Sequence, residues 1–185
     1  MKTKLKAITT KEAVAELLPL VETIWREVFP PIIEEAQIEY MLQNYQSQDN
    51  IWGEINNGVQ YYFITEENTR YVGYLAFELR EECLFISKIY LIQTARGKGL
   101  SSEIFDWLEE TALNHGKDRL QLRVNRSNTR AIEVYLHKGF VITHSGISDI
   151  GGGFVMDDYY FEKVLSTARP LCKEMRRVCY PPHLP

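Results

Sequence analysis

The sequence predicts an α/β fold built on a mixed, mostly antiparallel sheet. Three apolar runs separated by short polar turns follow one another over residues 59–92, which is typical of an antiparallel meander. From residue 99 onward the pattern alternates helix, strand, helix and strand, and this alternation implies crossover connections. The chain of 185 residues is 45% hydrophobic and 12% aromatic, which is enough to bury one sizeable core.

The N-terminal part is expected to be mainly helical. Residues 4–9 predict a short strand, and apolar residues at helical spacing over 14–28 predict a long amphipathic helix that two prolines end. A similar pattern over 33–45 predicts a second helix. Residues 49–56 predict a short third helical turn closed by the Asn-Gly pair at 57–58, although this pair also suits a hairpin turn.

The C-terminal half alternates between the two periodicities. Residues 99–115 carry an apolar stripe at helical spacing and end at a glycine, so they predict a helix that directly follows a strand. Residues 120–124 alternate like a strand, and 128–138 predict another helix between an asparagine and a glycine. Two further strands are expected at 140–147 and 154–165.

Composition argues against several classes of function. The net charge is −4 with both signs interspersed, so we expect no nucleic-acid partner. The sequence lacks an apolar run of membrane-spanning length and a secretory pattern, so we expect a cytoplasmic protein without a membrane partner. Neither the three cysteines nor the four histidines have metal-ligand spacing, so we expect no metal.

One domain is expected over residues 1–165, followed by an extension of unknown role at 166–185. The extension differs in character, with clustered cations, two cysteines and four prolines. A docking arm and an appended helix are both compatible with it. A homodimer is an open alternative, and the extension is one candidate for mediating it.

A basic, glycine-rich turn lies where a predicted strand meets the helix at 99–115. The start of a helix has backbone N–H groups without partners and a partial positive charge, which suit an anion. Gly97 and Gly99 allow close approach of the backbone to a ligand, and Arg96 and Lys98 add charge. We therefore predict a phosphate or pyrophosphate site, with a plain basic turn as the alternative. The turn lacks the P-loop pattern and the full dinucleotide fingerprint.

Two segments, 88–108 and 124–140, resemble the two central motifs of the GNAT superfamily, the Gcn5-related N-acetyltransferases. In that family a loop of the form (Q/R)-x-x-G-x-(G/A) binds the pyrophosphate of acetyl-coenzyme A. The six positions are filled here by Arg96, Gly97, Lys98, Gly99, Leu100 and Ser101. The last residue departs from the usual Gly or Ala, but serine is small and keeps its backbone N–H, so we expect affinity to survive.

The second motif places Asn128, Ala131 and Tyr135 on one helix face, at i, i+3 and i+7. In the family this asparagine contacts the cofactor, and this tyrosine is the usual proton donor to the departing thiolate. Taken singly, Asn128 reads as a helix cap and Tyr135 as a core aromatic. The order and separation of the two motifs favour the resemblance.

The resemblance also implies the architecture. It implies a mixed, mostly antiparallel sheet of six or seven strands, with splayed fourth and fifth strands and about four flanking helices. Splayed strands have unpaired backbone groups, to which the pantetheine arm of the cofactor binds as an extra strand would. By position, the backbone of Ile89 and Leu91 should provide these groups. Tyr90 points to the opposite face, where it is a further candidate for cofactor contact or a core residue.

The implied activity is transfer of the acetyl group of acetyl-coenzyme A to a primary amine of a small molecule or peptide. The resemblance assigns Tyr135 as general acid in a direct attack, and we expect a backbone N–H near Leu91 to stabilise the oxyanion. A sensor or scaffold module that binds acetyl-coenzyme A or coenzyme A without catalysis is the alternative. Some family members carry a glutamate on the fourth strand, whereas residues 83–92 contain no carboxylate.

The general base is not assigned by the sequence. Candidates with a carboxylate or imidazole outside the fourth strand are Glu34, Glu35, Glu78, His144, Asp157 and Asp158. For each of them a solvated surface charge is the alternative. The acidic residues around the first helices and the late-strand loop favour an amine acceptor. Residues 151–153, three glycines, suggest either a mobile turn near the acceptor site or the loop of a long hairpin.

Overall fold

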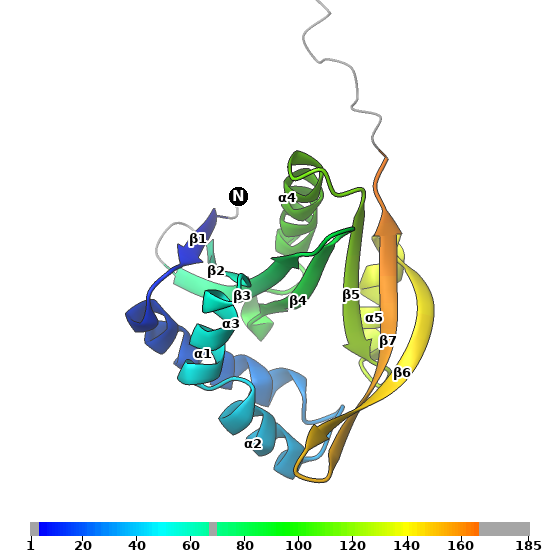
Figure 1. Ribbon diagram of the computed structural model, residues 1–185. Coiled ribbons are helices and arrows are strands. Elements are labelled where there is room, and N and C mark those ends of the chain that lie inside the picture. The colour runs from blue at the N-terminus through cyan, green and yellow to red at the C-terminus, as the bar shows by residue number, and fades with distance from the viewer. Residues whose placement is uncertain (1–3, 67–69, 167–185) are drawn as a thin grey trace, which may run out of the picture.

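The computed structural model describes residues 4–66 and 70–166, which form a seven-stranded sheet with helices on both faces (Figure 1). In chain order the elements are β1 (Lys4–Ile8), α1 (Lys11–Val28), α2 (Glu35–Asn44), α3 (Gln48–Asn56), β2 (Gln60–Glu66), β3 (Arg70–Leu79), β4 (Leu84–Leu91), the 3₁₀ turn η1 (Gln93–Ala95), α4 (Leu100–Asn114), β5 (Arg119–Asn125), α5 (Thr129–His137), β6 (Val141–Gly151) and β7 (Phe154–Val164). The predicted mixed α/β fold is confirmed. Of the predicted extension at 166–185, only residue 166 lies inside the described residues, so its role stays a prediction.

The third helix is longer than the sequence suggested. Residues 48–56 form a full helix, because the Ser47 side chain caps it by accepting a hydrogen bond from the Asn50 N–H. Asn57 ends this helix, and Gly58 adopts a positive φ of 98° before β2 begins. The hairpin reading of this Asn-Gly pair is therefore wrong. The described residues contain five α-helices where about four were expected.

The sheet has the order β1-β2-β3-β4-β5-β7-β6. All neighbouring pairs are antiparallel except β4 and β5, which are parallel. This parallel pairing joins only Leu84–Ile86 to Leu120–Leu122, although β4 continues to Leu91 and β5 to Asn125. The two central strands separate beyond that point, as Figure 1 shows, so the predicted splay is confirmed.

A bulge in β4 lies at the point of separation. Ala76 of β3 pairs with Lys88, whereas the next residue, Phe77, pairs with Ile86, so Ser87 is the extra residue. The Ser87 hydroxyl donates a hydrogen bond to the Ala76 carbonyl over 3.2 Å. Bulges increase local twist and re-aim the residues that follow them. The bulge therefore sets the direction in which the second half of β4 leaves β5.

Two neighbouring tyrosines of β2 show which helices cover which face. Tyr61 donates a hydrogen bond to Glu54 of α3, whereas the ring of Tyr62 packs against Trp107 of α4. Successive residues of a strand point to opposite faces, so α3 and α4 lie on opposite sides of the sheet. The first three helices share one side, and α5 joins α4 on the other through the Tyr135 and Phe105 rings.

The apolar stripe of α1 packs this helix against the side of the sheet that the first three helices cover. Its buried residues are Val14, Leu17, Val21, Ile24 and Trp25, and each recurs after three or four positions. Burying one such side chain stabilises the fold by about 1.5–3 kcal/mol. The Trp25 indole also donates to the buried Tyr74 hydroxyl over 3.1 Å. No helix among the described residues has the length and apolarity needed to cross a membrane.

Candidate functional site

A cavity of about 480 Å³ occupies the gap between the splayed strands. Its walls include residues 85–91 of β4 and 122–125 of β5, together with side chains from α1, the loop after α2, α5, β6 and β7. The cavity exists because β4 and β5 stop pairing after Ile86 and Leu122, which leaves the second half of each strand without a partner on that edge. The site is therefore a direct consequence of the sheet topology.

The glycine-rich turn borders this cavity. Gly97 and Gly99 have φ values of 77° and 83°, and Gly99 is the N-cap of α4. A Cβ at either position would meet no atom within 4 Å, so the backbone conformation, not crowding, is what requires glycine. The first backbone N–H groups of α4 have no acceptor within the helix, because the first such bond runs from Ser102 to the Gly99 carbonyl.

The six predicted loop residues divide into two groups. Arg96, Gly97 and Ser101 line the cavity, whereas Lys98, Gly99 and Leu100 do not. Lys98 extends to Glu66 at the end of β2, with 3.1 Å between Nζ and Oε1. Leu100 is buried in the core. Of the two predicted cations, only Arg96 faces the cavity, and the remaining contribution of the loop is its backbone.

Arg96 braces the turn against two elements. Its Nε donates to the Leu91 carbonyl over 2.9 Å, and its Nη2 donates to Glu27 of α1 over 3.0 Å. The same Glu27 oxygen accepts from the Gln93 N–H. Desolvation lowers the pKa of Arg96, the Glu27 charge opposes that change, and the nearby Arg130 adds to it. The Leu91 backbone is one of the predicted pantetheine contacts, and its carbonyl already accepts one hydrogen bond, from Arg96.

Arg130 is a cavity residue that the sequence reading missed. It lies in the first turn of α5 and lines the cavity, and its positive charge contributes to the lowered pKa of Arg96. Among residues 4–66 and 70–166 it makes no ion pair. Its position between Asn128 and Ala131 of the second motif was the available signal. Two guanidinium groups from different elements therefore stand at the same end of the cavity.

The three residues of the second motif all line the cavity. Asn128 caps α5, because its Oδ1 accepts from the Ala131 N–H over 3.2 Å, and its Nδ2 makes no hydrogen bond among the described residues. Tyr135 lies among the rings of Phe105, Phe140 and Phe161, with centroids 5.8–6.1 Å away. Burial raises the pKa of Tyr135 to about 12, so its hydroxyl keeps its proton at neutral pH. Asn128 is thus a helix cap and Tyr135 packs among core aromatics, while their roles toward a cofactor stay predictions.

Ile89, Tyr90 and Leu91 also line the cavity, as part of the half of β4 that pairs with β3 but no longer with β5. The Tyr90 ring packs against Phe29 and Tyr74, so it belongs to the aromatic cluster beneath α1 as well. Burial raises the pKa of Tyr90 well above its usual range. Tyr90 therefore lies in both the cavity wall and the core, and both predictions for it, cofactor contact and core residue, are compatible with this position.

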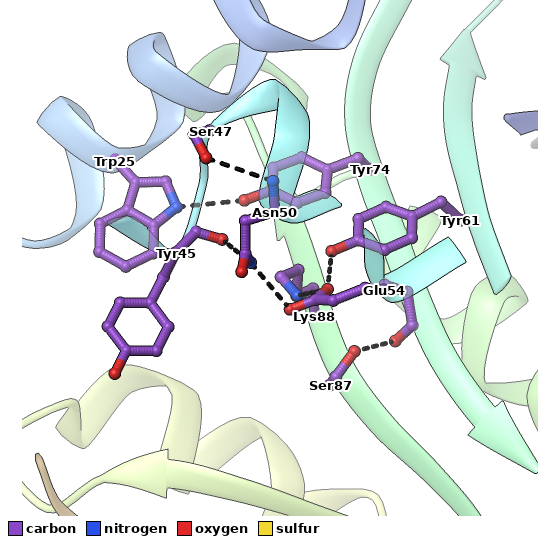
Figure 2. Close-up of polar contacts among 10 residues, drawn as sticks. Trp25, Tyr45, Ser47, Asn50, Glu54, Tyr61, Tyr74, Ser87 and Lys88 are labelled. Carbon is purple, nitrogen blue, oxygen red and sulfur yellow. Dashed lines mark hydrogen bonds and ion pairs between the residues drawn. The ribbon is translucent and has the colours of Figure 1, made fainter. Parts of the chain in front are cut away.

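A partly buried ion pair that was not predicted joins α3 to β4 (Figure 2). The Lys88 ammonium lies 2.7 Å from Glu54 Oε2, and the Tyr61 hydroxyl donates to the same oxygen. The Asn50 amide donates to the other carboxylate oxygen over 3.4 Å. Desolvation lowers the pKa of Lys88, and Glu54 opposes that change. Both charged residues line the cavity, but they satisfy each other.

Of the six candidate bases, only Asp158 lines the cavity. The residue is 7% exposed, and its Oδ1 has no hydrogen-bond partner among the described residues. Desolvation raises the pKa of its carboxyl group, the positive charge of Arg123 opposes that change, and Asp157 adds to it. The candidates that do not line the cavity are Glu34, Glu35, Glu78, His144 and Asp157.

The hairpin of β6 and β7 is docked on α2 at the far end of the cavity. The hydroxyls of Tyr40 and Tyr45 both donate to the Ile150 carbonyl, over 3.0 and 2.8 Å. A Cβ added at Gly152 would lie 2.7 Å from the Tyr40 ring, so this turn also needs glycine for close approach. The three glycines therefore belong to a long hairpin, which was one of the two predicted readings.

The fold and the cavity define an acetyltransferase architecture, and comparison with known proteins assigns the family. Residues 18–140 match the model of the Acetyltransferase (GNAT) family, so the chain belongs to that family. No curated protein sequence gives a match. The described residues contain no group of three or more potential metal ligands.

Solved structures share the fold at low sequence identity. One is the PaiA N-acetyltransferase of Thermoplasma acidophilum in complex with coenzyme A, with 17% identity, a TM-score of 0.73, and 89% of this chain and 99% of that chain covered. Another is a GCN5-related N-acetyltransferase of Rhodopseudomonas palustris, with 16% identity, a TM-score of 0.73, and 89% and 97% covered. A third is YncA of Salmonella typhimurium with acetyl-CoA, with 17% identity, a TM-score of 0.63, and 93% and 100% covered.

Proposed function

We propose that the protein is an acetyl-coenzyme A dependent N-acetyltransferase that acts on a primary amine of a small molecule or peptide. The observation that carries the proposal is the position of Tyr135, a protonated phenol in the wall of a cavity whose other end is a helix start with unpartnered N–H groups. The family membership and the similar structures that hold coenzyme A or acetyl-CoA support it.

The residues present fit acetyl-coenzyme A as a substrate. The pyrophosphate would be bound by the backbone N–H groups at the start of α4 and by the guanidinium groups of Arg96 and Arg130. The pantetheine arm would bind along residues 89–91, where β4 has lost its pairing with β5. The acetyl group would then lie in the gap, within reach of Tyr135. The side-chain Nδ2 group of Asn128, which makes no hydrogen bond among the described residues, is available to donate to the same ligand.

Transfer requires a neutral amine, a polarised carbonyl and a proton for the leaving sulfur. The amine nitrogen forms a bond to the thioester carbon, the carbon–sulfur bond breaks, and the sulfur takes the proton of the Tyr135 hydroxyl. The nitrogen loses one proton as it becomes an amide, which restores that hydroxyl through solvent. Aromatic burial keeps Tyr135 protonated until it is needed, and a backbone N–H near Leu91 would stabilise the oxyanion.

The test combines calorimetry with coenzyme A and an assay of thiol release over a panel of amines. Tyr135→Phe should lower kcat by about 100-fold or more and leave the affinity for acetyl-coenzyme A unchanged, because the ring is kept and the proton donor is lost. Tyr160→Phe is the matched control, because Tyr160 stacks on His144 and does not line the cavity. A wild-type kcat in Tyr135→Phe would contradict the assignment. Coenzyme A binding without acetylation of any amine would favour a sensor on the same fold.

A further inference from the structure

Two buried oxygen atoms without hydrogen-bond partners among the described residues belong to side chains of residues that line the same cavity. The two atoms are Oδ1 of Asp158 and Oε1 of Gln46, and the two residues are 7% and 6% exposed. Buried polar atoms are nearly always hydrogen-bonded, because leaving one unpaired costs about 1–3 kcal/mol. Both atoms are acceptors, so the missing partners are donors. A ligand that presents N–H or O–H groups to these two side chains would supply such donors.

The second carboxylate of the cavity has the opposite environment. Glu54 already accepts from Lys88, Tyr61 and Asn50, so its negative charge is neutralised and its oxygen atoms are occupied. Environments that differ in this way give two carboxylates different roles in one site. Glu54 is held as a structural anion, whereas Asp158 is the carboxylate that remains available to accept a proton.

The register places Asp158 beside the gap between the splayed strands. On β7 it pairs with Asn125, the last residue of β5, and the negative charge of Asp158 contributes to the raised pKa of Tyr90 on β4. Arg123 of β5 is the positive charge that Asp158 experiences. On its other side β6 presents Gly146, and the nearest titratable group of that strand is His144. Asp158 thus borders the space where the thioester would lie.

We infer that Asp158 is the proton acceptor for the acceptor amine, and that Gln46 accepts a hydrogen bond from a second donor on the same molecule. The inference rests on the proposed function and names its substrate class: aliphatic amines that carry at least one further N–H or O–H group, such as diamines. Asp158 comes from β7 and Gln46 from the loop between α2 and α3, so the acceptor would be held between the hairpin and the first helices.

The proton balance of the step is simple. The ammonium group of the bound amine gives one proton to the Asp158 carboxylate, which becomes a carboxylic acid, and the neutral amine then attacks the thioester carbon. Asp158 returns its proton to solvent when the amide product leaves. Desolvation raises the pKa of Asp158 above its ordinary value and thereby makes it a better base for this task.

The experiment uses the full chain, acetyl-coenzyme A, and two matched amines, diaminobutane and butylamine. Asp158→Asn keeps the size and one acceptor oxygen but removes the base, so kcat/KM for both amines should fall about 100-fold or more at neutral pH. The deficit should shrink as the pH rises toward the pKa of the amine itself, since the neutral amine then forms without help. Gln46→Leu should raise KM for diaminobutane about tenfold more than KM for butylamine.

Asp157→Asn is the control, because Asp157 pairs with Arg126 at the surface and does not line the cavity. Calorimetry with acetyl-coenzyme A shows that each variant is folded. If the wild type acetylates both amines and Asp158→Asn retains its kcat/KM, the assignment of Asp158 is overturned and the proposed function stands. An equal effect of Gln46→Leu on both amines overturns the second contact. If the wild type binds acetyl-coenzyme A but acetylates no amine, the proposed function fails and the inference fails with it.

Discussion

Replacing Lys88 by methionine should destabilise the fold although the side chain keeps nearly its full length. The Lys88 side chain is 9% exposed and its ammonium lies 2.7 Å from Glu54, which is 30% exposed. Methionine retains the packing of the stem but removes the charge. Glu54 would keep Tyr61 and Asn50 as donors and lose its counterion (Figure 2).

The size of the effect follows from what remains around Glu54. Breaking a fully buried ion pair on one side costs about 3–5 kcal/mol. Because Glu54 keeps two donors and some solvent contact, we expect the low end, about 3 kcal/mol. For a chain of this length that corresponds to a fall in Tm of about 6–12 °C. The double variant Lys88→Met with Glu54→Gln removes both charges and should be destabilised by only about 1 kcal/mol.

Chemical and thermal unfolding followed by circular dichroism measures the stability of four proteins: the wild type, Lys88→Met, Glu54→Gln and the double variant. Together they form a double-mutant cycle. Lys98→Met is the control, because Lys98 is half-exposed and its pair with Glu66 should contribute less than about 1 kcal/mol. Two results would contradict this argument: a fall in the free energy of unfolding of Lys88→Met of less than about 0.5 kcal/mol, or a double variant that is less stable than each single variant. Either would mean that the pair does not stabilise the packing of α3 on β4.

Three further variants test other parts of the site. Gly99→Ala forces alanine into a φ of 83°, at a strain of about 1–2 kcal/mol, and should weaken coenzyme A binding about tenfold by calorimetry; an unchanged Kd would contradict the role of the turn. Asp158→Asn should be more stable than the wild type at neutral pH. Burial raises the folded-state pKa of Asp158, so the wild type loses stability as the pH rises from 3.8 through that raised pKa, and a stability difference that does not grow over this range would refute the argument. Tyr40→Phe removes one of two hydrogen bonds to the Ile150 carbonyl; it should cost about 1 kcal/mol and speed amide exchange in the β6–β7 hairpin, and unchanged exchange would show that α2 does not hold the hairpin.

The elements that could be predicted are those whose signals are local. The long helix α1 follows from its apolar spacing, and the start of α4 follows from Gly99, which adopts a backbone conformation that few other residues tolerate. The splay of β4 and β5 was not read from the composition of either strand. It came from the resemblance, because nothing in the two sequences specifies where their pairing stops.

The ion pair of Lys88 and Glu54 could not be predicted for a different reason. The two residues are 34 positions apart, and they meet only because α3 packs over β4 at that point. Glu54 also lies in a segment that was predicted to form only a short helical turn. It was therefore not possible to predict which side of that segment the carboxylate would lie on. Arg130 was missed for a smaller reason. Its segment was correctly predicted as a helix, but the motif includes its neighbours Asn128 and Ala131 and not Arg130 itself. Both the ion pair and the position of Arg130 in the cavity depend on how elements pack against one another, which the local sequence does not specify.

The two adjacent aspartates show why choosing the base required the structure. Neighbouring strand residues point to opposite faces, so one of Asp157 and Asp158 had to point toward the side that the first helices cover. Both faces of β7 carry aromatic residues, Tyr160 on one and Phe161 on the other, so alternation of polarity could not identify that side. The structure gives Asp157 a surface partner and leaves Asp158 buried without one for Oδ1. A buried carboxylate left in this state weakens the fold, and sequences keep such conflicts mainly where a ligand removes them.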